Sequence, residues 1–221
     1  MYTPAHFAED RLPVLESLMQ AYPLATLITL TAGGLVANHI PLRFTPAPHA
    51  GPAPGAALAG VLTGHVARAN PIWREFDPAT DALAVFQGPQ AYITPSWYPT
   101  KHADGRVVPT WNYAVVHAYG RLQVRDDAAW AQALVEELTR EHESVRPAPW
   151  AVGDAPADYI AQLMRAIVGI EIPVTRLAGK WKTSGNQPAR LAASASEAER
   201  RMAALVGAHD PTPPDRGTPG A

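Results

Sequence analysis

The order of the secondary-structure signals predicts a mainly β protein of the α+β class, a small antiparallel barrel with peripheral helices. Short apolar runs separated by turns dominate the first 125 residues, whereas the helical patterns cluster late in the chain. A chain of 221 residues is long enough for one sizeable core. The sequence contains neither a P-loop nor a G-x-G-x-x-G motif after a strand, which disfavours a doubly wound α/β fold.

The first 125 residues read as one helix followed by successive β-strands. The helix is expected over 9–20, because its leucines fall on one face at helical spacing. Gly33-Gly34 supplies the first hairpin turn, and Gly88-Pro89 is expected to interrupt the fourth strand with a bulge or corner. Strands are expected over 24–30, 35–44, 58–66, 82–95 and 107–124.

The second half of the chain alternates helices with one further strand. Asp126 is expected to cap a helix, and a second helix is expected over 156–167. An alternating strand over 168–177 leads into a polar, glycine-containing loop over 179–189. A capping box then opens a last helix over 196–206.

These elements are predicted to form a single domain over residues 1–206. The stretch 45–57 is rich in proline, glycine and alanine and is interpreted as a surface loop of this domain. Residues 207–221 have no means of burying apolar surface and are expected to be a disordered tail. No signal peptide and no apolar run of ~20 residues is present, so a cytoplasmic protein with no membrane segment is expected.

Charge and residue counts exclude several classes of function. The net charge of −2 argues against nucleic acid as the main partner, which normally requires a basic face. The chain has no cysteine, which excludes disulfides and thiolate chemistry. The eight histidines show no metal-ligand spacing, and no G-x-S-x-G elbow occurs. Neither a metal site nor a hydrolase is therefore predicted.

The segment 90–119 concentrates aromatic side chains beside cations. It contains two of the six tryptophans and four tyrosines, together with Lys101, Arg106 and Thr110. Aromatic rings supply flat apolar area, and their polar edges need partners when buried. This combination predicts a pocket for a flat, partly anionic ligand. The alternative is that the rings pack a small barrel or a dimer seam.

Two further segments carry groups suited to phosphate. His65, Arg68 and Asn70 lie at the end of a predicted strand, and arginine offers a planar fork for phosphate. The alternative for Asn70 is a helix N-cap followed by Pro71. The second segment, 179–186, surrounds a glycine with two lysines, hydroxyls and an asparagine, which can wrap a phosphate.

Five motifs of this chain follow the order of one known family. They are MYTPAHF, GHVARANP, GPQAYITPSWYPTK, VPTWNYAVVHAYG and GKWKTSGNQP. In these motifs the chain resembles the PaiB-type family of FMN-binding negative transcriptional regulators, over roughly residues 1–190. The resemblance implies a split β-barrel like that of pyridoxamine-phosphate oxidase and flavin reductases. It also implies a homodimer with FMN at the subunit interface, and a repressor role linked to protease production and sporulation.

Carried over motif by motif, the resemblance also implies the residues near FMN. They are His65, Arg68, Asn70, Trp97, Tyr98, Lys101, Thr110, Trp111, Asn112, Lys180, Lys182, Ser184 and Asn186. Gly185 stands where the family usually has glutamine. Loss of that amide predicts flavin affinity weaker by ~1 kcal/mol.

The leading hypothesis is a dimeric FMN-binding protein with a regulatory role or a weak NAD(P)H-dependent oxidoreductase activity. No catalytic base is evident in the sequence, and flavin redox chemistry belongs largely to the cofactor. One alternative is a ligand-sensing regulator without catalysis, although the chain shows neither a helix-turn-helix nor a basic stripe, which argues against direct DNA binding. The other alternative is a haem-binding relative of the same fold, with His65 or His117 as axial ligand.

Overall fold

The computed structural model describes residues 1–48, 58–98, 101, 105–183, 191–194 and 196–208. The helices are α1 Leu12–Ala21, α2 Ile72–Glu75, α4 Ala128–Glu143, α5 Ala157–Arg165 and α7 Glu197–Ala208. Single 3-10 turns occur at Ala5–Phe7, Pro95–Trp97 and Val152–Asp154. The strands are β1 Ala8–Glu9, β2 Leu24–Thr31, β3 Gly34–Pro41, β4 Arg43–Pro46, β5 Gly60–Ala67, β6 Ala82–Ile93, β7 Thr110–Gly120, β8 Gln123–Arg125 and β9 Ile167–Lys182.

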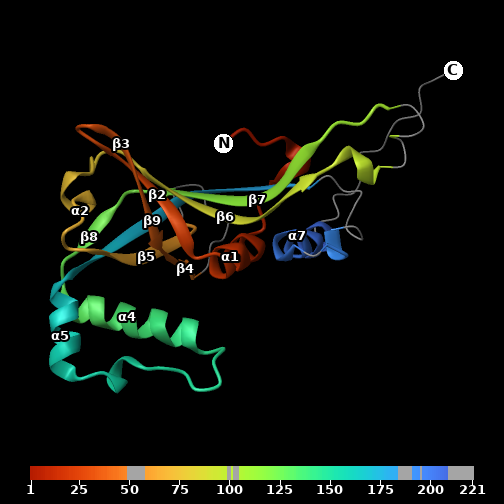
Figure 1. Cartoon of the computed structure of the whole chain (residues 1–221). Helices are drawn as coiled ribbons and strands as arrows, with labels where there is room; N and C mark the ends of the chain where they lie inside the picture. Colours follow the sequence, from red (N-terminus) through yellow and green to blue (C-terminus); the bar gives the residue numbers. More distant parts are fainter. Residues whose placement is uncertain (49–57, 99–100, 102–104, 184–190, 195, 209–221) are drawn as a thin grey trace. The chain divides into compact units, whose positions relative to one another are not determined.

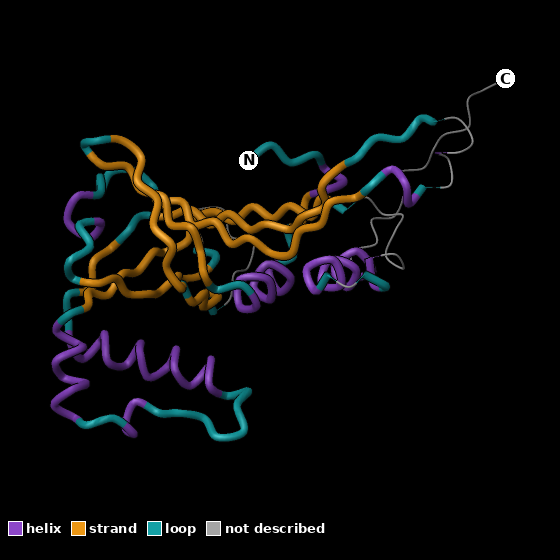
Figure 2. Tube along the Cα trace, in the orientation of Figure 1, coloured by secondary structure: helices purple, strands orange, loops and turns teal. Residues whose placement is uncertain are grey.

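The described strands belong to one hydrogen-bonded sheet (Figure 1) with the order β3-β2-β6-β7-β9-β5-β4. Both β1 and β8 pair with β9 outside this path. The registered pairings of β2 with β3 and β6, and of β5 with β4 and β9, are all antiparallel. Figure 2 shows these strands in orange and the helices in purple.

The described chain divides into two compact units. Unit 1 comprises Met1–Glu9, Gly88–Val115 and Gly179–Ala221, and unit 2 comprises Asp10–Gln87 and Val116–Ala178. The strands β6, β7 and β9 contribute residues to both units. A single domain over 1–206 stays a prediction, and most of the predicted tail, residues 209–221, lies outside the described residues.

Unit 2 is held together by alternating apolar residues that share one face of its strands. On β9 these are Val168, Ile170, Ile172 and Val174, each at most 1% exposed. One of their partners on β5 is Leu62, which is fully buried and pairs with Ile172. Antiparallel partners in register share a face, so the two strands bury one continuous apolar surface.

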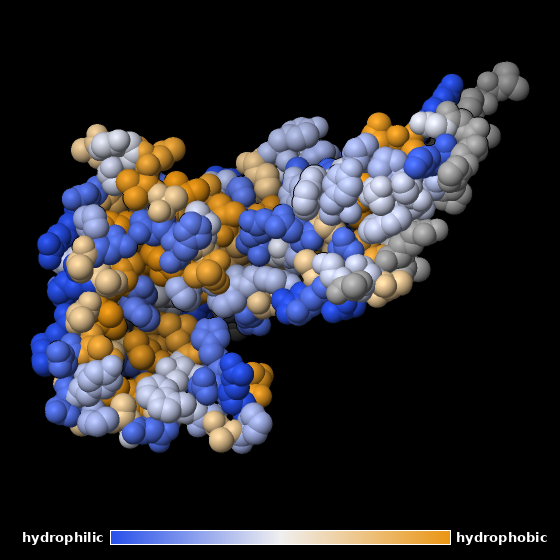
Figure 3. All heavy atoms as spheres, in the orientation of Figure 1, coloured by the Kyte–Doolittle hydropathy of each residue, from blue (hydrophilic) through white to orange (hydrophobic). Residues whose placement is uncertain are grey.

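Helix α4 covers the other face of β5 and β9 in unit 2. Figure 1 shows α4 running below β4 and β5, and Figure 3 shows hydrophobic residues between this helix and the strands. The ring of Trp130 packs directly on Gly169, where an added Cβ would lie 2.2 Å from the ring. His65 is the register partner of Gly169 and so lies on this same face.

Unit 1 has its own small core on one side of its strands. Ala91 and Ile93 of β6 pack with Leu191 and with Met202 and Ala203 of α7. The residues that alternate with Ala91 and Ile93 on β6, Gln90 and Tyr92, are exposed. The opposite face of this part of the sheet therefore carries Tyr92 in an exposed position.

The structure confirms most predicted elements and corrects several boundaries. The predicted strand 35–44 is two strands. Residues up to Pro41 form β3 and pair with β2, whereas residues from Arg43 form β4 and pair with β5. Leu42 lies between them and donates its amide to the Pro23 carbonyl oxygen at 2.9 Å. At the predicted interruption, Gly88-Pro89, β6 continues without a break, but two consecutive buried residues shift its alternation there, which agrees with the predicted bulge. The predicted strand 107–124 is divided into β7 and β8, and β9 is the longest described strand.

Two further corrections bear on the site. Asp127, not Asp126, caps α4 by accepting a hydrogen bond from the Trp130 amide at 2.8 Å. The start of the predicted loop 179–189 is in fact strand, because β9 continues to Lys182 and is extended there by pairing with β1. No helix among the described residues is long and apolar enough to span a membrane.

Candidate functional site

The exposed sheet face of unit 1 carries aromatic rings on neighbouring strands. Tyr92 of β6 and Trp111 of β7 meet edge to face with centroids 5.8 Å apart, and they are 45% and 53% exposed. Tyr113 lies two residues from Trp111 and so points to the same side of β7. Large rings left this open to solvent on a sheet are typical of a binding surface.

Two lysines of β9 contact β7, the strand that carries Trp111 and Tyr113. The Lys182 ammonium donates hydrogen bonds to Thr110 Oγ1 at 2.5 Å and to the Trp111 carbonyl oxygen at 2.6 Å. An ammonium has three N–H donors. Among the described residues, these contacts occupy two of them and leave the third for an acceptor such as a phosphate oxygen.

Lys180 is on the same side of β9 as Lys182 and is nearly buried. It donates a hydrogen bond to the Tyr2 carbonyl oxygen at 3.0 Å, and only 8% of it is exposed. Its ammonium also lies 5.8 Å from the Tyr2 ring centroid and 5.4 Å from that of Tyr113. A positive charge held against two ring faces is desolvated, which strengthens its attraction for an anion.

We call the set Tyr2, Tyr92, Trp111, Tyr113, Lys180 and Lys182 the aromatic–lysine face. Its donor set fits a ligand that is flat at one end and anionic at the other, because rings stack on flat systems and ammonium groups bind phosphate. The hydroxyl of Thr183, which follows Lys182, is buried and has no hydrogen-bond partner among the described residues. The sequence contains three lysines, and all of them, Lys101 included, belong to unit 1.

The other predicted residues of unit 1 are placed differently. Trp97 and Tyr98 are partly buried and pack against the small core. Lys101 donates a hydrogen bond to Ser96 Oγ at 3.0 Å in an exposed position. Asn112 is 1% exposed and lies on the side of β7 opposite to Trp111. Ser184, Asn186 and Gly185 lie outside the described residues.

In unit 2 protein groups accept hydrogen bonds from four of the five N–H donors of the Arg68 guanidinium. It pairs with both carboxylate oxygens of Asp126, at 2.5 and 3.0 Å, and it donates to the carbonyl oxygens of Arg165 at 2.9 Å and Ile167 at 3.1 Å. The hydrogen bonds from Arg68 also hold the pKa of Asp126 below its usual value. A phosphate role for Arg68 stays a prediction, and a bidentate phosphate contact through the two nitrogens that bind Asp126 would require Asp126 to release them.

Asn70 and His65 also have structural roles in unit 2. The Asn70 side chain accepts a hydrogen bond from the Ile72 amide at 3.0 Å and donates one to Asn38 Oδ1 at 2.8 Å. This supports the helix-entry interpretation of Asn70. His65 lies on the face covered by α4, where burial lowers the pKa of its imidazole. A flavin contact from either residue remains untested.

The flavin residues implied by the resemblance omit three members of the aromatic–lysine face, Tyr2, Tyr92 and Tyr113, although Tyr92 and Tyr113 are among the four tyrosines of segment 90–119, which was predicted to form a pocket. A signal for Tyr113 was present, because period-two alternation puts it on the same side of β7 as Trp111. No local pattern could indicate Tyr2, because its carbonyl oxygen accepts a hydrogen bond from Lys180, which lies 178 residues away in the sequence.

Comparison with solved structures identifies the class of protein. The flavocytochrome Anf3 from Azotobacter vinelandii superposes with a TM-score of 0.54 at 12% identity, covering 80% of this chain and 70% of that chain. The FAD and heme binding protein from Mycobacterium smegmatis gives a TM-score of 0.52 at 14% identity, covering 79% of this chain and 72% of that chain. The fold is thus the mainly β split barrel with a few helices that the sequence predicted.

Sequence comparison identifies the family. Residues 1–176 match the family described as "Putative FMN-binding domain". The protease synthase and sporulation protein PAI 2 of Bacillus subtilis is 32% identical over 190 residues, which cover 85% of this chain and 83% of that protein. An uncharacterized protein of Emericella nidulans is 36% identical over 214 residues, covering 83% and 84% of the two chains. The chain belongs to the PaiB-type family of FMN-binding proteins, and FMN is its cofactor.

Proposed function

We propose that the aromatic–lysine face holds FMN, with Lys180 and Lys182 meeting the phosphate and with Trp111 and Tyr92 beside the isoalloxazine ring. The observation that carries this proposal is that both ammonium groups contact β7: Lys180 lies 5.4 Å from the Tyr113 ring centroid, and Lys182 binds the carbonyl oxygen of Trp111, whose ring meets Tyr92 of the adjacent strand. Phosphate binding by lysine is charge-assisted, and stacking on exposed rings needs no rearrangement of the sheet.

We further propose that the bound flavin supports a weak NAD(P)H-dependent reduction of flavin or of a small acceptor. FMN supplies the hydride-accepting and electron-transferring chemistry when it is bound. The residues of the aromatic–lysine face include no carboxylate or imidazole that could serve as a general base. Their expected part is therefore to bind the phosphate, orient the ring and exclude water, and a cytoplasmic supply of NAD(P)H would suit this role.

A second copy of the chain is the expected partner of this face. Trp111 and Tyr92 are about half exposed, and rings of this size are usually covered in a working assembly. Coverage by a second copy would make the protein a homodimer with flavin at the subunit interface. Size-exclusion chromatography with light scattering tests this: a monomeric mass for the FMN-loaded protein would exclude it.

A regulatory role is the second candidate, favoured by the name of the Bacillus subtilis relative, a protease synthase and sporulation protein. Direct repression requires DNA binding, which a gel shift on the upstream region of its own gene tests across a salt series. Absence of salt-dependent binding would leave repression indirect. The haem alternative draws on the names of the two solved structures, and an absorption spectrum separates the two cofactors.

The decisive experiment is a titration of the purified, flavin-free protein with FMN and with riboflavin. If the lysines meet the phosphate, FMN should bind more tightly than riboflavin, and flavin bands near ~370 and ~450 nm should persist after desalting. NADH and NADPH are then offered to the loaded protein under anaerobic conditions, and bleaching at ~450 nm is followed. Equal affinity for the two flavins would remove Lys180 and Lys182 from a phosphate site, and no bleaching with either donor would remove the redox role.

A further inference from the structure

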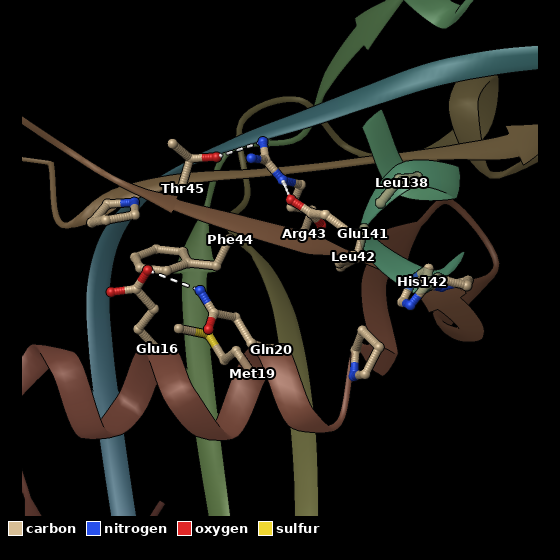
Figure 4. A pocket seen from close by; sticks show the side chains of 13 residues that line it. Glu16, Met19, Gln20, Leu42, Arg43, Phe44, Thr45, Leu138, Glu141 and His142 are labelled. Carbon is tan, nitrogen blue, oxygen red and sulfur yellow. Dashed lines mark hydrogen bonds and ion pairs between the residues drawn. The ribbon is translucent and has the colours of Figure 1, made fainter. Parts of the chain in front are cut away.

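Unit 2 contains a cavity that none of the predicted flavin residues lines. It has a volume of about 410 Å³ and lies where α1, β4 and α4 converge (Figure 4). Small-molecule sites typically measure about 300–1,000 Å³, so this cavity can hold a compact organic ligand.

The floor of the cavity is apolar. Met19, Leu42 and Phe44 line it, and each is at most 4% exposed. Leu138 of α4 and the prolines Pro23, Pro41 and Pro46 continue the apolar lining. Because these three side chains are already nearly buried, a hydrophobic body placed against them gains free energy mainly from its own apolar area removed from water.

One side of the rim is a fixed guanidinium with two carboxylates. Arg43 Nε donates to Glu141 Oε1 at 2.5 Å, and a second guanidinium nitrogen lies 2.9 Å from Glu137 Oε1. A third nitrogen donates to Thr45 Oγ1 at 3.1 Å. Figure 4 shows the contacts of Arg43 with Glu141 and Thr45. Because its positive charge is already matched by two carboxylates, Arg43 has little attraction left for an anionic ligand.

The opposite side of the rim carries an acid with a neutral partner. Glu16 of α1 accepts a hydrogen bond from the Gln20 amide at 3.0 Å, and among the described residues it takes part in no ion pair. Glu16 and Glu141 both line the cavity, as do Arg43 and the exposed His142. Two carboxylates and one guanidinium give this lining a negative formal charge, so the rim complements a cation.

We propose that this cavity binds a small organic cation, a primary ammonium group carried on a compact aromatic or branched aliphatic body. The body occupies the floor formed by Met19, Leu42 and Phe44, and the ammonium group pairs with the Glu16 carboxylate at the rim. The site consists only of unit 2 residues and does not rest on flavin binding.

The test uses the FMN-loaded protein labelled with ¹³C at its methionine methyl groups. The chain has four methionines, of which Met19 lines the cavity, while Met164 and Met202 lie elsewhere. Titration with 2-phenylethylamine should shift the Met19 methyl resonance in a saturable way and leave Met164 and Met202 unmoved. 3-Phenylpropionate has the same body with an anionic head and should bind at least about fivefold more weakly.

Two variants assign the charge preference to Glu16. Glu16→Gln should weaken 2-phenylethylamine binding about fivefold. Glu136→Gln is the matched control. Glu136 also accepts a hydrogen bond from a glutamine of its own helix, Gln132, at 2.9 Å, and it does not line this cavity. Glu16→Lys should reverse the preference, so that 3-phenylpropionate binds more tightly than 2-phenylethylamine.

The proposal is overturned by any of three results. These are equal affinity of the wild-type protein for the amine and the acid, equal loss of affinity in the Glu16→Gln and Glu136→Gln variants, and shifts at Met202 in place of Met19. Glu16 is partly exposed at the protein surface, so both of its variants should fold, and unchanged melting temperatures verify this.

Discussion

Replacement of Lys182 by methionine should selectively weaken the binding of the flavin phosphate. Methionine keeps the length and apolar body of the side chain and removes its charge. The Lys182 ammonium is held by Thr110 Oγ1 at 2.5 Å and the Trp111 carbonyl oxygen at 2.6 Å, so it is pre-oriented before a ligand arrives. A hydrogen bond to a charged group is worth about 1.5–3 kcal/mol, which predicts an increase of about 10- to 150-fold in the FMN dissociation constant.

The assay for Lys182→Met is quenching of tryptophan fluorescence by FMN and, separately, by riboflavin. Riboflavin has the same ring without phosphate, so its affinity should stay within about twofold of the wild-type value. Arg121→Met is the control, because Arg121 is an exposed cation of unit 2 that binds the Pro78 carbonyl at 2.8 Å. The reasoning fails if FMN affinity is unchanged in Lys182→Met, or if riboflavin loses as much affinity as FMN does.

Three further predictions concern stability and are checked by chemical denaturation. Leu191→Ala removes a fully buried side chain from the unit 1 core and should cost about 2–5 kcal/mol; a cost under about 1 kcal/mol would mean that the core does not depend on it. Gly169→Ala places a Cβ 2.2 Å from the Trp130 ring and should cost about 1–3 kcal/mol, whereas Gly153→Ala, with nothing within 4 Å, should cost far less. Burial lowers the pKa of His65, so below about pH 6.5 this histidine binds a proton in the unfolded chain but not in the folded chain. Stability should therefore fall as the pH drops from about 6.5 towards the folded pKa, by up to about 1.4 kcal/mol per pH unit, and His65→Gln should show a shallower slope.

Local patterns predicted the elements of the fold well, because hydrophobic alternation and turn residues act over a few positions. The hairpin of β2 and β3, the inward residues Val168 and Ile170, and the order of the strands along the chain all follow from such patterns. The boundaries that were wrong depend on distant partners. The break at Leu42 exists because β3 pairs with β2 whereas β4 pairs with β5. The residues next to Leu42 in the sequence do not indicate this change of partner strand.

The candidate site shows the same division. The lysine pair and Trp111 stood out as residue types, and the structure brings them to one face of the sheet. The sequence placed Lys180 and Lys182 on a loop, because it could not indicate that β1 extends β9 by pairing with it. Arg68 looked like a phosphate ligand, but the sequence could not show that Asp126, 58 residues further on, binds its guanidinium. Contacts of this separation are set by topology, and no local periodicity reports them.

The confinement of every lysine to unit 1 makes this protein unusually easy to map by covalent labelling. Unit 2 displays its positive charge through guanidinium groups, which acylating reagents such as succinimidyl esters do not modify under conditions that modify amines. The only side-chain amines to which the reagent can attach are those of Lys101, Lys180 and Lys182, all in unit 1. The mass of the intact chain after brief labelling therefore counts the accessible amines of the aromatic–lysine face and its surroundings. Comparing this mass with and without flavin shows whether flavin covers these amines, and the comparison requires no mutation, crystal or activity assay.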